Sequence, residues 1–130
     1  MSGRLILAYG GSGSGKSAWA EQTLLSQAAR TPGGRAVYLA AMESSGPEAA
    51  ARIQRHRAMR ARHGAEAGLN FVTMERPTGI SGAPVRPGDF VLLEDLGNLL
   101  ANEIWSPTGS GPENAPAHIL EGVDTLLERV

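Results

Sequence analysis

Residues 8–21, "AYGGSGSGKSAWAE", contain the motif on which the interpretation of this chain depends. Within them, residues 10–17 hold four glycines, three serines and Lys16, the only lysine of the chain. The spacing of the glycines, followed by Lys16 and Ser17, matches the pattern G-x-x-x-x-G-K-[ST]. In that pattern the backbone amides of a glycine-rich loop surround phosphate groups, so the sequence predicts a phosphate-binding loop.

The segments on either side of this loop supply the context that the motif requires. The apolar run "RLILAY", Arg4 to Tyr9, is typical of a buried parallel strand. The segment from Ser17 to Arg30 is rich in helix-forming residues and ends at a Thr-Pro-Gly-Gly stop. We therefore expect a strand, then the loop, then a helix whose free amides and partial positive charge face the phosphates.

Each part of the loop has an expected role toward a nucleotide. Lys16 would reach the β and γ phosphates, and the Ser17 hydroxyl would ligate Mg²⁺. A flexible Gly/Ser loop is the alternative, but it would require neither the lysine and serine nor the preceding strand. The predicted nucleotide-binding residues of the loop are Gly10, Gly11, Ser12, Gly13, Ser14, Gly15, Lys16 and Ser17.

The remaining chain alternates short apolar runs with helical patterns. We expect strands at Ala36–Ala41, Asn70–Met74 and Asp89–Asp95, and helices at Ser44–Gly64 (with a Ser45/Glu48 capping box), Leu96–Trp105 and His118–Val130, with a loop at Ser106–Pro116. This alternation predicts an α/β fold, a P-loop NTPase-like three-layer sandwich in which helices flank a mainly parallel sheet.

Composition narrows the class of protein. The chain has 130 residues, 42% of them hydrophobic, so we expect a single P-loop nucleotide-binding domain over residues 1–130. The net charge of -1 gives no global reason to expect nucleic acid as a partner. No apolar run is long enough to span a membrane, no signal peptide is apparent and there is no cysteine, so we expect a cytoplasmic protein.

A second candidate site follows the strand "DFVLLED". Glu94 and Asp95 emerge at its end, where a carboxylate would face the Mg²⁺ ion or a water bound to it. Asp95 could instead cap the next helix.

The segment "EAAARIQRHRAMRARHG" is the least ordinary feature of the chain. It carries five arginines and one acid, and a spacing of four places Arg52, His56 and Arg60 on one face. Neighbouring cations disfavour a second positive charge, so we expect His56 to be neutral near pH 7, with a nitrogen lone pair available beside bound phosphates. A solvated basic helix, or an electrostatic contact with nucleic acid, remains open on these residues alone.

Four stretches together resemble the bifunctional adenosylcobinamide kinase / adenosylcobinamide-phosphate guanylyltransferase family of cobalamin biosynthesis. They are "GGSGSGKSAWAE", "ARIQRHRAMR", "TMERP" and "LLEDLGNLLANEI", in the family's order and close to its spacing. The resemblance implies an enzyme that phosphorylates adenosylcobinamide with ATP or GTP. It then transfers GMP from GTP to the new phosphate through a guanylylated histidine, giving adenosylcobinamide-GDP.

The resemblance also assigns roles to residues of this chain. His56 would be the guanylylated, catalytic histidine, Arg60 would lie near the nucleotide, and Glu94 would contact the nucleotide or, with Ser17, its Mg²⁺. Asn102 matches a family position with a structural role. The chain departs from the family pattern at Ala41, Met42, Arg55, Ala61, Asp95 and Gly97.

The resemblance further implies that the family's C-terminal third is missing here, which would expose a sheet edge. We expect a homo-oligomer, and the family implies a trimer. The expected partners are a nucleoside triphosphate and a corrinoid substrate. Another small-molecule P-loop kinase, with a dispensable His56, and a non-catalytic nucleotide-binding remnant are the alternative functions.

Overall fold

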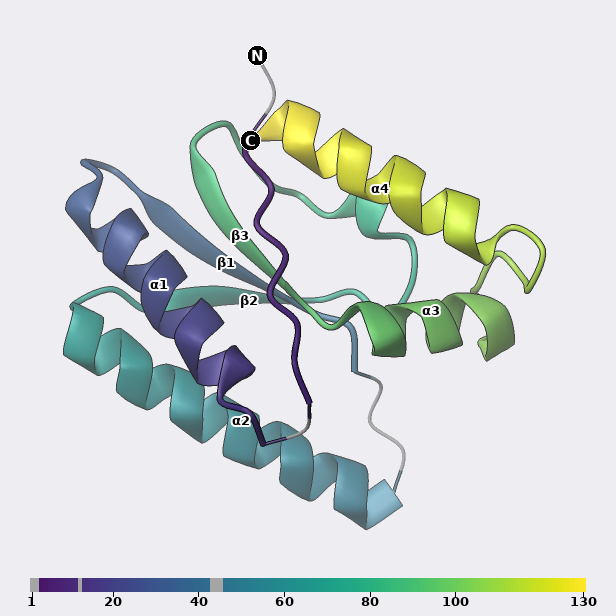
Figure 1. Cartoon of the computed structure of the whole chain (residues 1–130), viewed down its shortest axis with the longest axis horizontal. Coiled ribbons are helices and arrows are strands. Elements are labelled where there is room, and N and C mark those ends of the chain that lie inside the picture. The colour runs from purple at the N-terminus through teal and green to yellow at the C-terminus, as the bar shows by residue number, and fades with distance from the viewer. Residues whose placement is uncertain (1–2, 12, 43–45) are drawn as a thin grey trace.

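The computed structural model describes residues 3–11, 13–42 and 46–130. Within them the chain folds into helices and strands that alternate along the sequence (Figure 1). The elements are α1 (Lys16–Arg30), β1 (Arg35–Ala40), α2 (Gly46–Ala67), β2 (Phe71–Glu75), the 3-10 turn η1 (Ile80–Gly82), β3 (Asp89–Glu94), α3 (Leu96–Trp105) and α4 (Ala115–Arg129).

The three strands form one parallel sheet in the order β2-β1-β3. The register aligns Ala40 of β1 with Glu75 on one side and Glu94 on the other. At the opposite end of the sheet, Asp89 accepts hydrogen bonds from the Arg35 guanidinium at 2.8 and 2.6 Å. Because the strands are parallel and in register, their carboxyl ends bring two carboxylates to the same edge.

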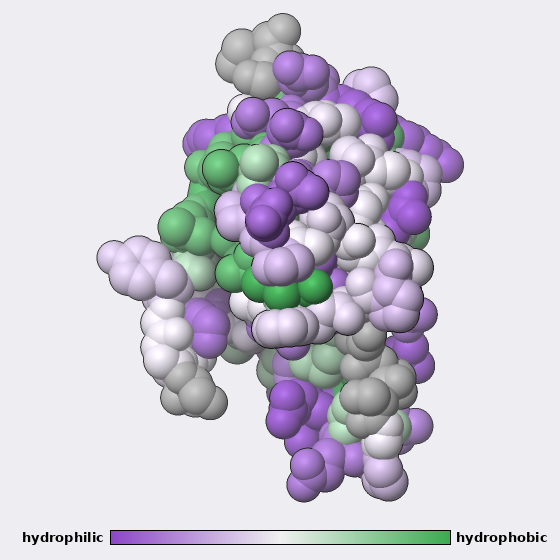
Figure 2. Space-filling model, turned by 90° about the vertical axis from the view of Figure 1, so that its right-hand side faces the viewer, coloured by the Kyte–Doolittle hydropathy of each residue, from purple (hydrophilic) through white to green (hydrophobic). Residues whose placement is uncertain are grey.

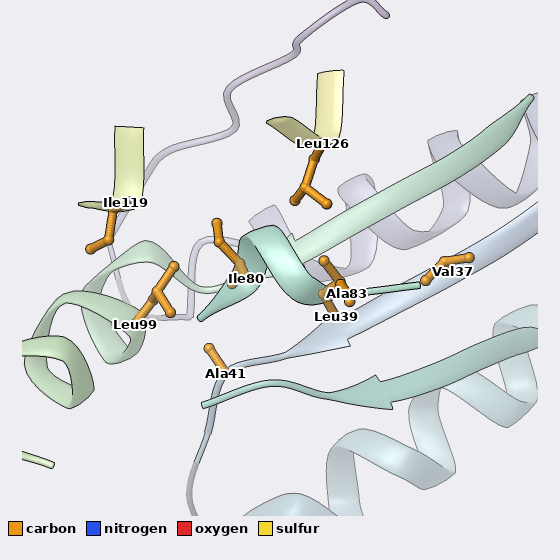
Figure 3. Packing of buried hydrophobic residues seen from close by; sticks show 8 residues of the cluster. All are labelled: Val37, Leu39, Ala41, Ile80, Ala83, Leu99, Ile119 and Leu126. Atoms are coloured by element: carbon orange, nitrogen blue, oxygen red, sulfur yellow. The ribbon is translucent and has the colours of Figure 1, made fainter. Parts of the chain in front are cut away.

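Helices cover both faces of the sheet, as Figure 1 shows: α1 and α2 on one, and α3, α4 and η1 on the other. Alternate residues of β1 point to opposite faces, because successive side chains of a strand alternate. Ala36 packs with Leu25 and Ala28 of α1. The second cluster is the larger one and comprises Val37, Leu39, Ala41, Ile80, Ala83, Leu99, Ile119 and Leu126 (Figure 3). The predicted three-layer α/β sandwich with a parallel sheet is confirmed.

The bounds of the elements agree with the sequence predictions for all but one strand. The predicted helix at Leu96–Trp105 has those bounds in the structure, and the other helices and strands from α1 to α4 begin and end within a few residues of the predicted positions. The predicted Ser45 half of the capping box lies outside the described residues, as does Ser12 of the glycine loop.

The predicted strand at Arg4–Tyr9 is wrong. These residues form neither helix nor strand, and Leu5, Ile6 and Leu7 are 53–65% exposed. A strand exists only by pairing, and Gly3, the residue just before this segment, instead donates its amide to the carbonyl of Leu127 in α4 at 2.6 Å. The apolar run therefore leads into the glycine loop as an unpaired segment.

Hydrophobic surface is present on the side of the molecule where α3 and α4 meet their connecting loop. Figure 2 shows this side, with hydrophobic areas between hydrophilic ones. Trp105 and Leu120 are among the exposed large apolar side chains of the described residues.

The predicted homo-oligomer stays a prediction. No helix within the described ranges is both long and apolar enough to cross a lipid bilayer.

We predict that Gly122→Ala destabilises the protein by about 1–2 kcal/mol, because overpacking outweighs the helix propensity of alanine. A Cβ atom at Gly122 of α4 would lie 2.6 Å from Cγ1 of Ile80, a core residue that is 1% exposed. The matched control is Gly97→Ala in α3, where the nearest atom would be 3.4 Å away. Urea unfolding followed by circular dichroism checks both; equal free energies of unfolding for the two variants would contradict the prediction.

Candidate active site

The glycine loop turns directly into α1. Gly13 and Gly15 have φ angles of 73° and 88°, in the left-handed region that side chains other than that of glycine disfavour. Gly15 is the N-cap of α1 and, being a glycine, has no side chain with which to cap the amides of the first turn. Lys16 and Ser17 are the first two residues of the helix. The loop thus presents uncapped backbone amides next to the lysine, which is an arrangement suited to an anion.

Glu94, at the end of β3, joins this loop to the sheet. One carboxylate oxygen accepts a hydrogen bond from the Ser17 hydroxyl, and the other accepts one from the hydroxyl of Tyr38 at 2.5 Å. Tyr38 lies on β1 and is 3% exposed. Burial, together with the neighbouring Glu94 carboxylate, raises the pKa of Tyr38 well above its ordinary value. The phenol therefore remains protonated and acts as a donor to Glu94.

One face of α2 closes a hollow over the carboxyl ends of the strands. His56 and Arg60 line this hollow together with Glu94 and Asp95, the last residue of β3 and the one that follows it. The structure thus brings the predicted residues His56, Arg60 and Glu94 together. The described residues of the glycine loop do not line the hollow, and Ser17 connects to it through Glu94.

The prediction that Arg52, His56 and Arg60 share one face of α2 is only partly right. Ile53, His56, Arg57 and Arg60 face the hollow, whereas Arg52 is exposed and does not line it. A helix has 3.6 residues per turn, so steps of three and four together define a face, and two steps of four drift away from it. Arg57 also forms an exposed ion pair with Glu75 of β2 at 2.9 Å.

Arg60 is a buried cation, with 7% of the residue exposed. Its guanidinium carbon lies 3.8 Å from the centre of the Tyr38 ring, a cation–π contact. Within the part of the chain that the structure describes, no carboxylate lies within salt-bridge distance of Arg60. A buried guanidinium without an ion-pair partner is costly, and it favours an anion in the hollow that it lines.

A buried pair between α1 and α2 was missed by the sequence analysis. Glu21 of α1 and His63 of α2, which are 0% and 5% exposed, approach to 2.9 Å. Burial raises the pKa of Glu21, and the hydrogen bond to His63 opposes this shift. Helical spacing could have indicated both residues: Glu21 is four residues after Ser17 and His63 is three after Arg60, so each shares a helix face with a predicted site residue. The pair ties the loop helix to the histidine helix.

The N-cap of α3 and two residues within the helix have structural roles. Asp95 accepts the amide of Asn98 at 2.7 Å, so the capping alternative for Asp95 holds. Asn102 donates to the carbonyls of Ala41 and Pro77 at 2.6 and 3.0 Å. Sequence reasoning missed Glu103, which is 1% exposed and accepts the amides of Gly79 and Ser110, both at 2.9 Å. These bonds fix the loops that follow β2 and α3.

The donor set suits Mg²⁺ bound to a nucleotide. Ser17 and Glu94 supply a hydroxyl and a carboxylate in direct contact, and Mg²⁺ is held in such sites by one or two protein oxygens, phosphates and waters. Within the described ranges, no cluster of three or more histidine or acidic side chains could hold a metal by itself.

A parallel sheet between helical layers, with a glycine-rich loop leading into α1, is the architecture of the P-loop NTPase-like sandwich. The family model described as cobinamide kinase / cobinamide phosphate guanyltransferase matches residues 6–130, and the chain belongs to this family. Its members are transferases of cobalamin biosynthesis that act on cobinamide. Searches of curated proteins and of solved structures gave no match.

We predict that Glu21→Gln changes the pH dependence of stability. The pKa of Glu21 is raised above 4.5 in the folded protein, so its contribution to stability is present below that pH and is lost as pH rises through the folded pKa. Glutamine does not titrate. The free energy of unfolding of the wild type, relative to that of Glu21→Gln, should therefore fall as pH rises from 4.5 through the folded pKa of Glu21. Urea titrations across this range measure the difference, and a constant or rising difference would contradict the raised pKa.

Proposed function

We propose that the chain catalyses both reactions of its family: phosphorylation of adenosylcobinamide by ATP or GTP, and transfer of GMP from GTP to the resulting phosphate. One observation carries the proposal. His56 and Arg60 share a hollow with Glu94, and Glu94 contacts the serine that ends the phosphate-binding motif. A candidate nucleophile, a cation and a carboxylate therefore lie around one hollow, where we infer that the phosphates of the nucleotide bind.

His56 is the proposed nucleophile for guanylyl transfer. A lone pair of its imidazole attacks the α-phosphorus of GTP, the bond from that phosphorus to the α,β-bridging oxygen breaks, and pyrophosphate leaves. A phosphate oxygen of cobinamide phosphate then attacks the same phosphorus. The phosphorus–nitrogen bond breaks, and its electron pair returns to the imidazole. Arg60, which lines the same hollow, offsets the charge of the phosphates during both displacements.

The glycine loop is the proposed site of the phosphoryl-transfer step. Lys16 and the uncapped amides at the start of α1 hold the triphosphate. The substrate hydroxyl attacks the γ-phosphorus and loses its proton to solvent, the bond from that phosphorus to the β,γ-bridging oxygen breaks, and the nucleoside diphosphate leaves. Ser17 and Glu94 would hold Mg²⁺, which neutralises charge on the phosphates when it is bound. Catalysis here depends on positioning and electrostatics rather than on a covalent intermediate.

We predict that incubation with α-labelled GTP and Mg²⁺ leaves a GMP adduct on the protein, and that His56→Ala abolishes it because the phosphoramidate requires the imidazole. The matched control is His118→Ala, since His118 is a partly exposed histidine of α4, 3.7 Å from Glu103 and outside the hollow. Mass analysis after denaturation, with acid and alkali treatment, identifies the acid-labile bond. An adduct that survives in His56→Ala, or no adduct in a wild-type protein that binds GTP, would overturn the guanylyltransferase assignment.

Arg60 provides a test of nucleotide binding. We predict that Arg60→Ala weakens GTP binding by about 10-fold or more, because a charge-assisted hydrogen bond contributes about 1.5–3 kcal/mol. Arg62→Ala, on an exposed arginine of the same helix, should leave the affinity unchanged. Isothermal titration calorimetry gives both dissociation constants, and circular dichroism confirms that both variants are folded. Equal affinities for the two variants would contradict a specific role for Arg60.

A further inference from the structure

Tyr38 makes three directional contacts with different parts of the candidate site. Its hydroxyl donates to Glu94 at 2.5 Å, one face of its ring lies under the Arg60 guanidinium at 3.8 Å, and its ring meets that of Phe71 edge-on with centroids 5.7 Å apart. The residue is 3% exposed and lies on β1, the central strand. Neither the phosphate-binding motif nor the histidine helix includes it.

The hydroxyl limits the orientation of the Glu94 carboxylate. Tyr38 holds one oxygen of Glu94, and this leaves the other oxygen directed at Ser17. Without the phenol, the carboxylate could rotate about its last torsion, which is broad for glutamate. The oxygen that faces Ser17, and with it the proposed Mg²⁺ position, would then be less well defined.

The ring of Tyr38 contacts Arg60, on the α2 side of the site. Arg60 has no ion-pair partner among the residues that the structure describes, and the Tyr38 face is the contact that holds its buried guanidinium. The side chain of Tyr38 therefore makes two separable contacts: its hydroxyl bonds to the Glu94 carboxylate, and its ring packs against the Arg60 guanidinium.

We propose that Tyr38 is a positioning residue that fixes Glu94 for the metal through its hydroxyl and Arg60 for the phosphates through its ring. The loop and histidine sides of the site are thereby held at a constant spacing by one rigid side chain of the central strand. This inference rests on the proposed function, because it assumes that a metal-bound nucleotide occupies the hollow.

The test is calorimetric binding of a non-hydrolysable GTP analogue, measured with Mg²⁺ and with EDTA. Tyr38→Phe removes the hydroxyl and keeps the ring, so we expect it to reduce the gain in affinity due to Mg²⁺ by about 10-fold and to leave the EDTA affinity unchanged. Tyr38→Leu also removes the ring, so it should weaken binding in EDTA as well. Phe71→Leu is the matched packing control: it removes the edge-on contact with Tyr38 and leaves both polar contacts in place.

A double-mutant cycle with Glu94→Gln separates positioning from packing. If the Tyr38 hydroxyl acts through the Glu94 charge, Tyr38→Phe should have no further effect on the Mg²⁺ gain in the Glu94→Gln background. Additive effects, an unchanged Mg²⁺ gain in Tyr38→Phe, or an equal loss in Phe71→Leu would each overturn the inference. These outcomes leave wild-type nucleotide binding intact. Failure of the wild type itself to bind the analogue would instead overturn the proposed function, and the inference with it.

Discussion

The contact of the Glu94 carboxylate with Ser17 and Tyr38 holds the candidate site together. Ser17 belongs to the helix that begins at the glycine loop, Tyr38 to the central strand and Glu94 to the strand beside it. Register makes the contact possible, because parallel pairing places Glu94 beside Ala40 at the carboxyl edge of the sheet. Tyr38 lies two residues after Ala36 in β1, and Glu94 lies four residues after Phe90 in β3. Ala36 and Phe90 pack with residues of α1, so Tyr38 and Glu94 point to the same face of the sheet, toward α1 and α2.

Most of the fold could be predicted from local sequence signals. The apolar runs that became β1 and β3, and the leucine spacing of α3, were sufficient to define those elements. The segment Arg4–Tyr9 has an equally apolar pattern but no strand, since pairing depends on a partner edge and not on composition alone. Local patterns predict which segments can be strands, and tertiary contacts decide which of them pair.

The site was predictable where function depends on spacing within one segment. The glycine motif and the four-residue step from His56 to Arg60 were both found this way, and the structure places His56, Arg60 and Glu94 around one hollow. Tyr38, Glu21 and His63 were missed, because their partners are distant in the chain. Tyr38 and Glu94 are 56 residues apart, and Glu21 and His63 are 42 apart. The role of a buried polar side chain depends on its partner, and sequence spacing does not identify a partner that is far away in the chain.

Arg60 is buried without the compensation that its charge requires. A cation–π contact with Tyr38 contributes about 0.5–2 kcal/mol, whereas moving an ion out of water costs several kcal/mol, so the stacking alone does not offset the burial. Glu21 supplies only a weaker, more distant attraction, and its own carboxylate is already bonded to His63. An uncompensated buried charge is a common sign of a functional site, where stability is lower so that a ligand can supply the missing counter-charge. The triphosphate of the proposed function would be that counter-charge, and His56 lines the same hollow as Arg60.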